Sequence, residues 1–198
     1  MSKNKEPKSK LSEAEKTEKK LRKITEEIAD LRKKYIKQIS KSAAMDVKDY
    51  TLKSNDGSDI KLSEMFGDKK YLYIIHNMGK SCSYCTLWAD GFSGVTYFIE
   101  KKAAFAVVSP DAPEVQKEFS ESRGWKFRMY SSVGSEFTKD MGYYTDAGAY
   151  WPGVSVFQKI ADGSIKRISK DFFGPGDFYS SPWHLFDLLP KDEESGNK

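Results

Sequence analysis

The chain contains 198 residues, of which 38% are hydrophobic and 14% aromatic, so we expect one domain with a substantial core. Its net charge of +4 is unevenly spread: residues 1–44 hold 14 Lys/Arg and 7 Asp/Glu, whereas residues 45–198 hold 19 and 22. The basic character therefore belongs to the leading segment, which argues against a chain-wide nucleic-acid binder. No run approaches the roughly 20 apolar residues that span a bilayer. We expect no nucleic-acid partner and no membrane.

The start of the chain, from Met1 to Lys5, leads into no apolar segment of the kind found in secretory signals. The chain has two cysteines, which in a cytosolic protein are more often redox-active, catalytic or metal-binding than structural. These features predict a cytoplasmic protein, and no motif calls for a bound cofactor.

Residues 1–10 are rich in lysine and are expected to be disordered. From Leu11 to about Lys41 the pattern predicts one long amphipathic helix. An arm that packs on its own domain or on a second subunit is the favoured interpretation, and in the second case the helix would form a homodimer. A nucleic-acid or membrane role is disfavoured, because seven acidic residues dilute the positive field. The apolar residues recur at steps of three and four, as in Leu21, Ile24, Ile28, Leu31 and Tyr35.

The domain boundaries follow from these patterns: a disordered start and helix over 1–44, an α/β domain over 45–190, and a flexible tail over 191–198. Strands and helices alternate from residue 71, which predicts a parallel β-α-β unit. The expected elements are a hairpin and a helical turn within 50–66, strands at 71–77 and 103–109, helices at 82–101, 111–124, 132–141 and 182–189, and a closing hairpin formed by 151–157 and 165–173.

The two cysteines, Cys82 and Cys85, form a C-x-x-C pair directly after the apolar strand and at the start of the next helix. A helix N-terminus carries unpaired N–H groups and a partial positive charge, which favour a thiolate over a thiol. Cys82 would then be the attacking thiolate, and Cys85, one turn further in, the resolving thiol. The alternative to a redox pair is that both cysteines are unreactive residues of the core.

This order of elements resembles the thioredoxin fold, a central mixed sheet flanked by helices, here with a long N-terminal helix added. The run from Phe105 to Pro113, followed by Ser131-Ser132 and Glu136-Phe137, also resembles the peroxiredoxin branch. A larger set of motifs extends from Leu11 to Pro190: Glu15-Lys16, Leu62–Phe66, Cys82-Ser83-Tyr84-Cys85, Ala89-Asp90-Gly91-Phe92, Gly124-Trp125, Ser131-Ser132, Pro152–Phe157 and Phe186–Pro190. With these motifs the chain resembles the bacterial thioredoxin-like family called domain of unknown function 899.

The resemblance to thioredoxins implies further site residues. His76 stands six residues before Cys82, where thioredoxins hold a buried acid, and would act as the base for the resolving cysteine. Pro152 matches the proline whose cis peptide faces the cysteine pair, and with Trp151 it would help to bind substrate. A metal site of both cysteines with His76 and His184 lacks the usual ligand spacing, so none is expected.

The favoured function is a thiol–disulfide oxidoreductase that acts on a disulfide-containing protein or small molecule. A non-catalytic thioredoxin-fold binding or scaffold protein is the first alternative, and a thiol peroxidase is the second. The thioredoxin pattern is incomplete, because Ser81 replaces its tryptophan and Ser83-Tyr84 its Gly-Pro. The peroxiredoxin pattern of a proline and a Thr/Ser before the reactive cysteine is missing.

Overall fold

The computed structural model describes residues 12–190; the lysine-rich start and the tail at 191–198, which the sequence predicts to be disordered and flexible, lie outside the described residues. The chain forms two compact units, one up to Ile39 and one from Ser40 onward. No helix within the described part is long and apolar enough to cross a membrane.

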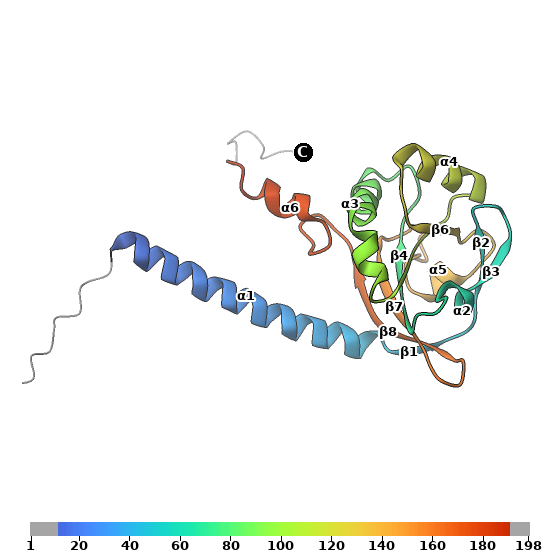
Figure 1. The fold of residues 1–198 in the computed structure, drawn as a ribbon, viewed down its shortest axis with the longest axis horizontal. Helices are drawn as coiled ribbons and strands as arrows, with labels where there is room; N and C mark the ends of the chain where they lie inside the picture. The colour runs from blue at the N-terminus through green and yellow to red at the C-terminus, as the bar shows by residue number, and fades with distance from the viewer. Residues whose placement is uncertain (1–11, 191–198) are drawn as a thin grey trace, which may run out of the picture. The chain divides into compact units, whose positions relative to one another are not determined.

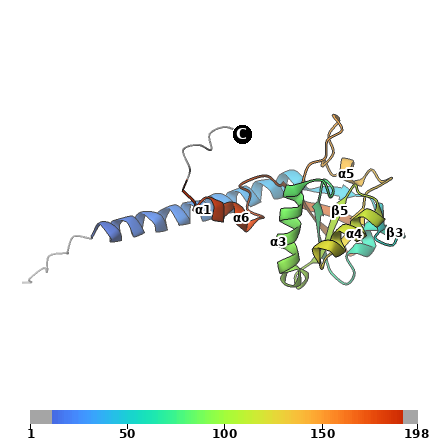
Figure 2. The ribbon, with the colours of Figure 1, turned by 90° about the horizontal axis from the view of Figure 1, so that it is seen from above.

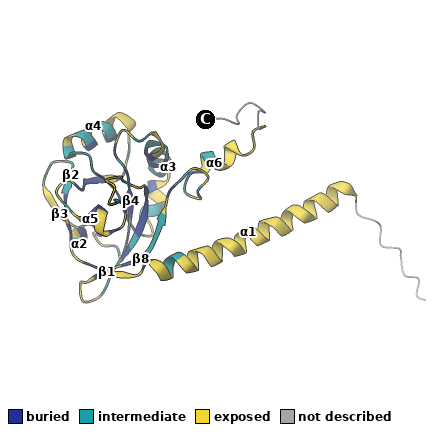
Figure 3. Ribbon diagram, turned by 180° about the vertical axis from the view of Figure 1, so that it is seen from behind, coloured by how far each residue is buried: buried dark blue, intermediate teal, exposed yellow. Residues whose placement is uncertain are grey.

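Helix α1 (Glu13–Ala43) confirms the long helix predicted for the leading segment. It begins with a capping box, because the Glu15 N–H donates to the Ser12 hydroxyl and the Ser12 N–H donates to the Glu15 carboxylate. The apolar stripe keeps more than half of its surface exposed at Leu21, Ile24, Ile28 and Leu31, as the colouring of Figure 3 illustrates. A homodimer through this stripe stays a prediction.

The second unit is built on an eight-stranded mixed sheet in the order β1-β8-β7-β4-β5-β6-β2-β3 (Figure 1). The central strands β4, β5 and β6 are parallel, and all other neighbours are antiparallel. The strands are β1 (Met45–Val47), β2 (Thr51–Ser54), β3 (Asp59–Lys61), β4 (Tyr71–His76), β5 (Ala104–Ser109), β6 (Arg128–Ser131), β7 (Gly153–Lys159) and β8 (Ile165–Phe172).

Helices cover both faces of this sheet. The crossovers β4-α3-β5 and β5-α4-β6 move across the sheet in the same direction, so their helices share one face, and α5 lies on the other side (Figure 2). One apolar core lies under α3, and a second lies under α2 and α5 on the opposite face. The remaining helices are α2 (Leu62–Met65), α3 (Ser83–Glu100), α4 (Pro113–Arg123), α5 (Phe137–Asp140) and α6 (Ser181–Phe186).

The structure confirms the predicted α/β class and the parallel unit, and differs in three short elements. Strands β1 and β6 have only three and four residues and were not expected from the sequence. Helix α5 is much shorter than the predicted 132–141, because Gly134 takes a positive φ of 75° and the Ser135 N–H closes a turn onto the Ser132 carbonyl.

Candidate functional site

Cys82 is the N-cap residue of α3, so the cysteine pair stands at the helix start, where the sequence predicts it. Its sulfur accepts the backbone N–H of Cys85 at 3.1 Å, so the thiol occupies the place that a Ser or Asp side chain takes at other helix starts. The side chain is partly exposed and the thiol is free. Cys82 is therefore the member of the pair that a reactant can reach.

Cys85 lies one turn further along and is 2% exposed. Burial raises the pKa of the Cys85 thiol, and the adjacent Cys82 sulfur, as its hydrogen-bond partner, raises it further. The Met78 N–H donates to the Cys85 sulfur at 3.4 Å and partly offsets this rise in pKa. The pair is therefore asymmetric: one accessible sulfur at the helix end, and one buried thiol that holds its proton.

The loop between β4 and α3 is held in place by Asp111, at the carboxyl end of β5. The Asp111 carboxylate accepts the Lys80 N–H at 2.9 Å and the Ser109 hydroxyl at 3.0 Å. Gly79 has φ +107°, and a Cβ added there would lie 2.9 Å from the Asp111 carboxylate, so this position needs glycine. The Asn77 side chain accepts the Gly79 N–H at 2.8 Å. These contacts fix the backbone that leads into Cys82.

His76, the predicted base, is buried in the core. Its ring stacks on Tyr143 at a centroid distance of 3.7 Å and on Phe137 at 5.6 Å, and its Nε2 lies 3.0 Å from the Ser155 hydroxyl. Burial is the main cause that lowers the His76 pKa well below its ordinary value, so the imidazole is neutral.

The structure does not bring His76 and the cysteines together. Side chains alternate between the two faces of a strand, and Ile75 packs in the same core as Cys85. His76 points to the other face, where its ring neighbours Phe137 and Tyr143 belong to the second core. This placement gives no support to a proton transfer between His76 and Cys85.

The buried neutral His76 makes stability depend on pH. Its pKa is depressed in the folded chain, so its contribution is fully present above about pH 6.5, the ordinary histidine pKa, and is lost as the pH falls toward the depressed value. We expect the free energy of unfolding, measured in urea, to fall between about pH 7 and about pH 5, and the variant His76→Leu to flatten this slope. The exposed second histidine provides the control, since His184→Leu should keep the wild-type slope. An unchanged slope in His76→Leu would contradict the assignment.

Pro152 is buried just before β7, next to the end of β4, since Gly153 pairs with His76. The predicted cis peptide is wrong: no peptide bond in residues 12–190 is cis. The trans backbone is already satisfied here, because the Trp151 N–H donates to the Tyr143 carbonyl and the Pro152 carbonyl accepts the Phe173 N–H, each at 2.9 Å.

Trp151 is 51% exposed, and its ring lies edge-on to Phe172 at 6.2 Å. Neither Trp151 nor Pro152 lines the hollow of about 420 Å³ beside the cysteine pair. Tyr150 lines it instead, a residue that belongs to none of the sequence motifs. The hollow is lined by Met78, Ser81, Cys82, Ser83, Tyr84 and Tyr150.

His184 lies on α6, where it is exposed and stacks on Phe178. The structure therefore does not place it with the cysteines and His76. Within the described part of the chain, no group of three or more His, Cys, Asp or Glu side chains could hold a metal ion.

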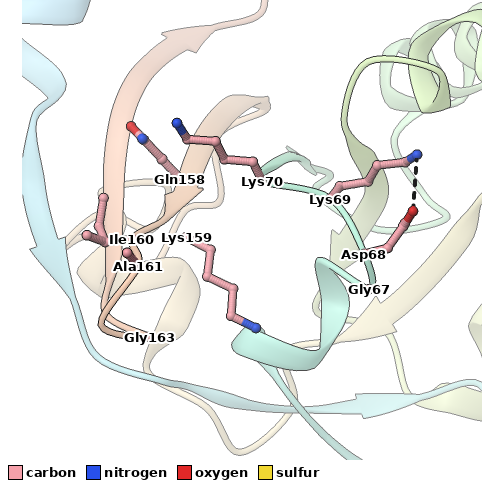
Figure 4. A pocket seen from close by; sticks show the side chains of 9 residues that line it. All are labelled: Gly67, Asp68, Lys69, Lys70, Gln158, Lys159, Ile160, Ala161 and Gly163. Atoms are coloured by element: carbon pink, nitrogen blue, oxygen red, sulfur yellow. Dashed lines mark ion pairs between the residues drawn. The ribbon is translucent and has the colours of Figure 1, made fainter.

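A hollow of about 610 Å³ near the start of β4 and the β7–β8 turn is lined by Lys69, Lys70 and Lys159. Figure 4 shows that the three ammonium groups point in different directions, and Lys69 pairs with Asp68 at 3.5 Å. Because these charges do not converge on one point, we place the candidate site at the cysteine pair.

A mixed sheet with a cysteine pair at the first helix after a central strand defines the thioredoxin-like class. Solved structures with a similar fold include Peroxidoxin BcpB from Mycobacterium tuberculosis, at 18% identity over 73% of this chain and 92% of that one, with a TM-score of 0.55. Reduced Prx3 from Vibrio vulnificus has 17% identity over 74% and 94%, with a TM-score of 0.55. A peroxiredoxin-like protein from Aquifex aeolicus has 19% identity over 66% and 73%, with a TM-score of 0.51.

The particular family follows from the sequence match. Residues 3–196 match the family described as bacterial protein of unknown function (DUF899), and the chain belongs to this family. Among curated proteins, none matches the chain. The resemblance read from the motifs is thus confirmed, together with the thioredoxin-like fold that it implies.

Proposed function

We propose that the protein is a thiol–disulfide oxidoreductase that uses Cys82 and Cys85. The observation that carries the proposal is the asymmetry of the pair: the Cys82 sulfur caps α3 and accepts a helix N–H, whereas the Cys85 thiol is buried behind it. The first arrangement favours a nucleophilic thiolate, and the second keeps the resolving thiol protonated until it is needed.

The chemistry proceeds in two exchanges. The Cys82 thiolate attacks one sulfur of a substrate disulfide, so a mixed disulfide forms and the other substrate half leaves as a thiolate that takes up a proton. Cys85 then loses its proton and attacks the Cys82 sulfur, which releases the second half as a thiol. The substrate gains two electrons, and the protein is left with a Cys82–Cys85 disulfide that an external thiol or dithiol reductant must reduce.

Thiol titration tests this proposal directly. After equilibration in buffers of reduced and oxidised glutathione, alkylation followed by mass spectrometry should show both cysteines converting together between dithiol and disulfide. In Cys82→Ser, alkylation of Cys85 should stay slow at a pH where an ordinary cysteine, with a pKa of about 8.5, has ionised. A pair that stays reduced across all buffers would instead favour the non-catalytic binding protein.

A thiol peroxidase is the second candidate, and the structural neighbours support it, since one of them is reduced Prx3 in complex with hydrogen peroxide. Here the Cys82 thiolate would attack a peroxide oxygen, giving a sulfenic acid and releasing water or an alcohol, and Cys85 would displace a second water to form the same disulfide. Stopped-flow oxidation by hydrogen peroxide, compared with a small disulfide at equal concentration, separates the two: the faster oxidant identifies the substrate class.

A further inference from the structure

A second pocket of about 500 Å³ adjoins the hollow at Cys82, and Tyr150 lines both. Tyr150 belongs to a small hairpin: its backbone bridges that of Tyr144, and the two rings lie 4.6 Å apart. Both tyrosines are half-buried, and burial is the main cause that raises the Tyr150 pKa. A neutral phenol can both donate and accept a hydrogen bond. This tyrosine pair is the wall that the two pockets share.

The second pocket lies at the carboxyl ends of the parallel strands, where ligands of open α/β sheets usually bind. Pro110 directly follows β5 and Ser132 directly follows β6, and both line the pocket. Its volume falls within the range of small-molecule sites. Ser135 and Thr138 also line the pocket.

Two opposite charges stand in this lining, Glu136 and Lys139. Their closest atoms are 3.7 Å apart, and both side chains are about two-thirds exposed, so the pair is loose. A ligand that carries a carboxylate and an ammonium on one carbon can pair with both side chains at once and form two charge-assisted hydrogen bonds. The backbone groups in the interior of a polypeptide are neutral amides, which would form no ion pair with Glu136 or Lys139.

We propose that this pocket binds the amino-acid end of a small disulfide, whose α-carboxylate pairs with Lys139 and whose α-ammonium pairs with Glu136. The disulfide sulfur then lies over Cys82, and the connecting chain crosses Tyr150. This inference rests on the proposed function and names its substrate class: disulfides of low-molecular-weight amino-acid or peptide thiols.

The test compares two disulfides in the same protein preparations. Glutathione disulfide carries the amino-acid group, whereas bis(2-hydroxyethyl) disulfide carries no charge and no amino-acid group. We expect Lys139→Met and Glu136→Gln each to lower the ratio of kcat/KM for glutathione disulfide to kcat/KM for the uncharged disulfide by about 10-fold. The control Lys126→Met, an exposed lysine two residues before β6, should keep the wild-type ratio. Both kcat/KM values are measured on the same preparation, so a misfolded fraction lowers both equally and leaves their ratio unchanged.

Binding of S-methylglutathione, measured by calorimetry, separates the two proposals because it needs no redox step. Binding that weakens about 10-fold in Lys139→Met supports the pocket assignment even if no disulfide is reduced, which would overturn only the proposed function. Unchanged ratios and no binding would overturn the pocket assignment while the oxidoreductase stands. Faster reduction of a protein disulfide, such as that of insulin, with unchanged ratios would likewise overturn it in favour of a polypeptide substrate.

Discussion

Replacing Cys82 with serine is expected to lower the rate of disulfide reduction by about 10³-fold or more, while the protein stays folded. A serine hydroxyl is a weak nucleophile at neutral pH without an adjacent base, so the first exchange stops. Serine is also among the best N-cap residues and can accept the Cys85 N–H in place of the Cys82 sulfur. The helix start is therefore retained, and the loss reports the chemistry rather than the fold.

Cys85→Ser should behave differently, and this difference tests the assigned order. The first exchange proceeds, so one equivalent of substrate thiol is released and a mixed disulfide accumulates on Cys82, visible by mass spectrometry as one adduct. Turnover then falls because no resolving thiol remains. Accumulation of the adduct in Cys82→Ser instead would reverse the two roles, and unchanged turnover in both variants would remove the redox proposal.

Much of the fold could be predicted because its strongest signals are local. Strands β4 and β5 are apolar runs buried on both faces, and each is followed by a helix with clear start signals. The short strands β1 and β6 give no such signal, because three or four residues are too few to show a period. Their strand character comes from pairing with β8 and β5, which the local sequence does not encode.

In the candidate site, too, the features that depend on neighbouring residues could be predicted, and those that depend on distant segments could not. The helix-capping position of Cys82 depends on neighbouring residues and was predictable. Asp111 and Tyr150 reach the site from separate loops, so only the three-dimensional structure shows their contacts. The base role for His76 depended on which face of β4 meets α3, and a spacing of six residues does not settle that face. Serine and aspartate at the end of β5 were a usable signal for Asp111, because such residues gather where parallel strands end.

There is no room for a side chain at Gly153, although its φ does not lie in the left-handed region that favours glycine. An added Cβ would overlap the Asp171 carbonyl and the Tyr143 ring, and would lie 3.2 Å from the Phe172 Cα. Neither neighbour can move easily, because the single Tyr143 O–H is shared between the Val154 carbonyl at 2.7 Å and the Asp171 carbonyl at 3.1 Å. The glycine therefore permits β8 and a buried tyrosine to approach the start of β7.

We expect Gly153→Ala to lower the free energy of unfolding by about 3 kcal/mol or more, because the overlap involves backbone and a packed ring. The matched control is Gly91→Ala in α3, where an added Cβ meets nothing within 4 Å and should raise stability by about 0.5–1 kcal/mol. Urea unfolding of both variants measures the two effects. Since Gly153 pairs with His76, at the end of the strand that leads into the cysteine loop, any folded Gly153→Ala should also show a changed alkylation rate at Cys82. Equal stability of the two alanine variants would show that the start of β7 can shift, and that the packing at Tyr143 does not fix it.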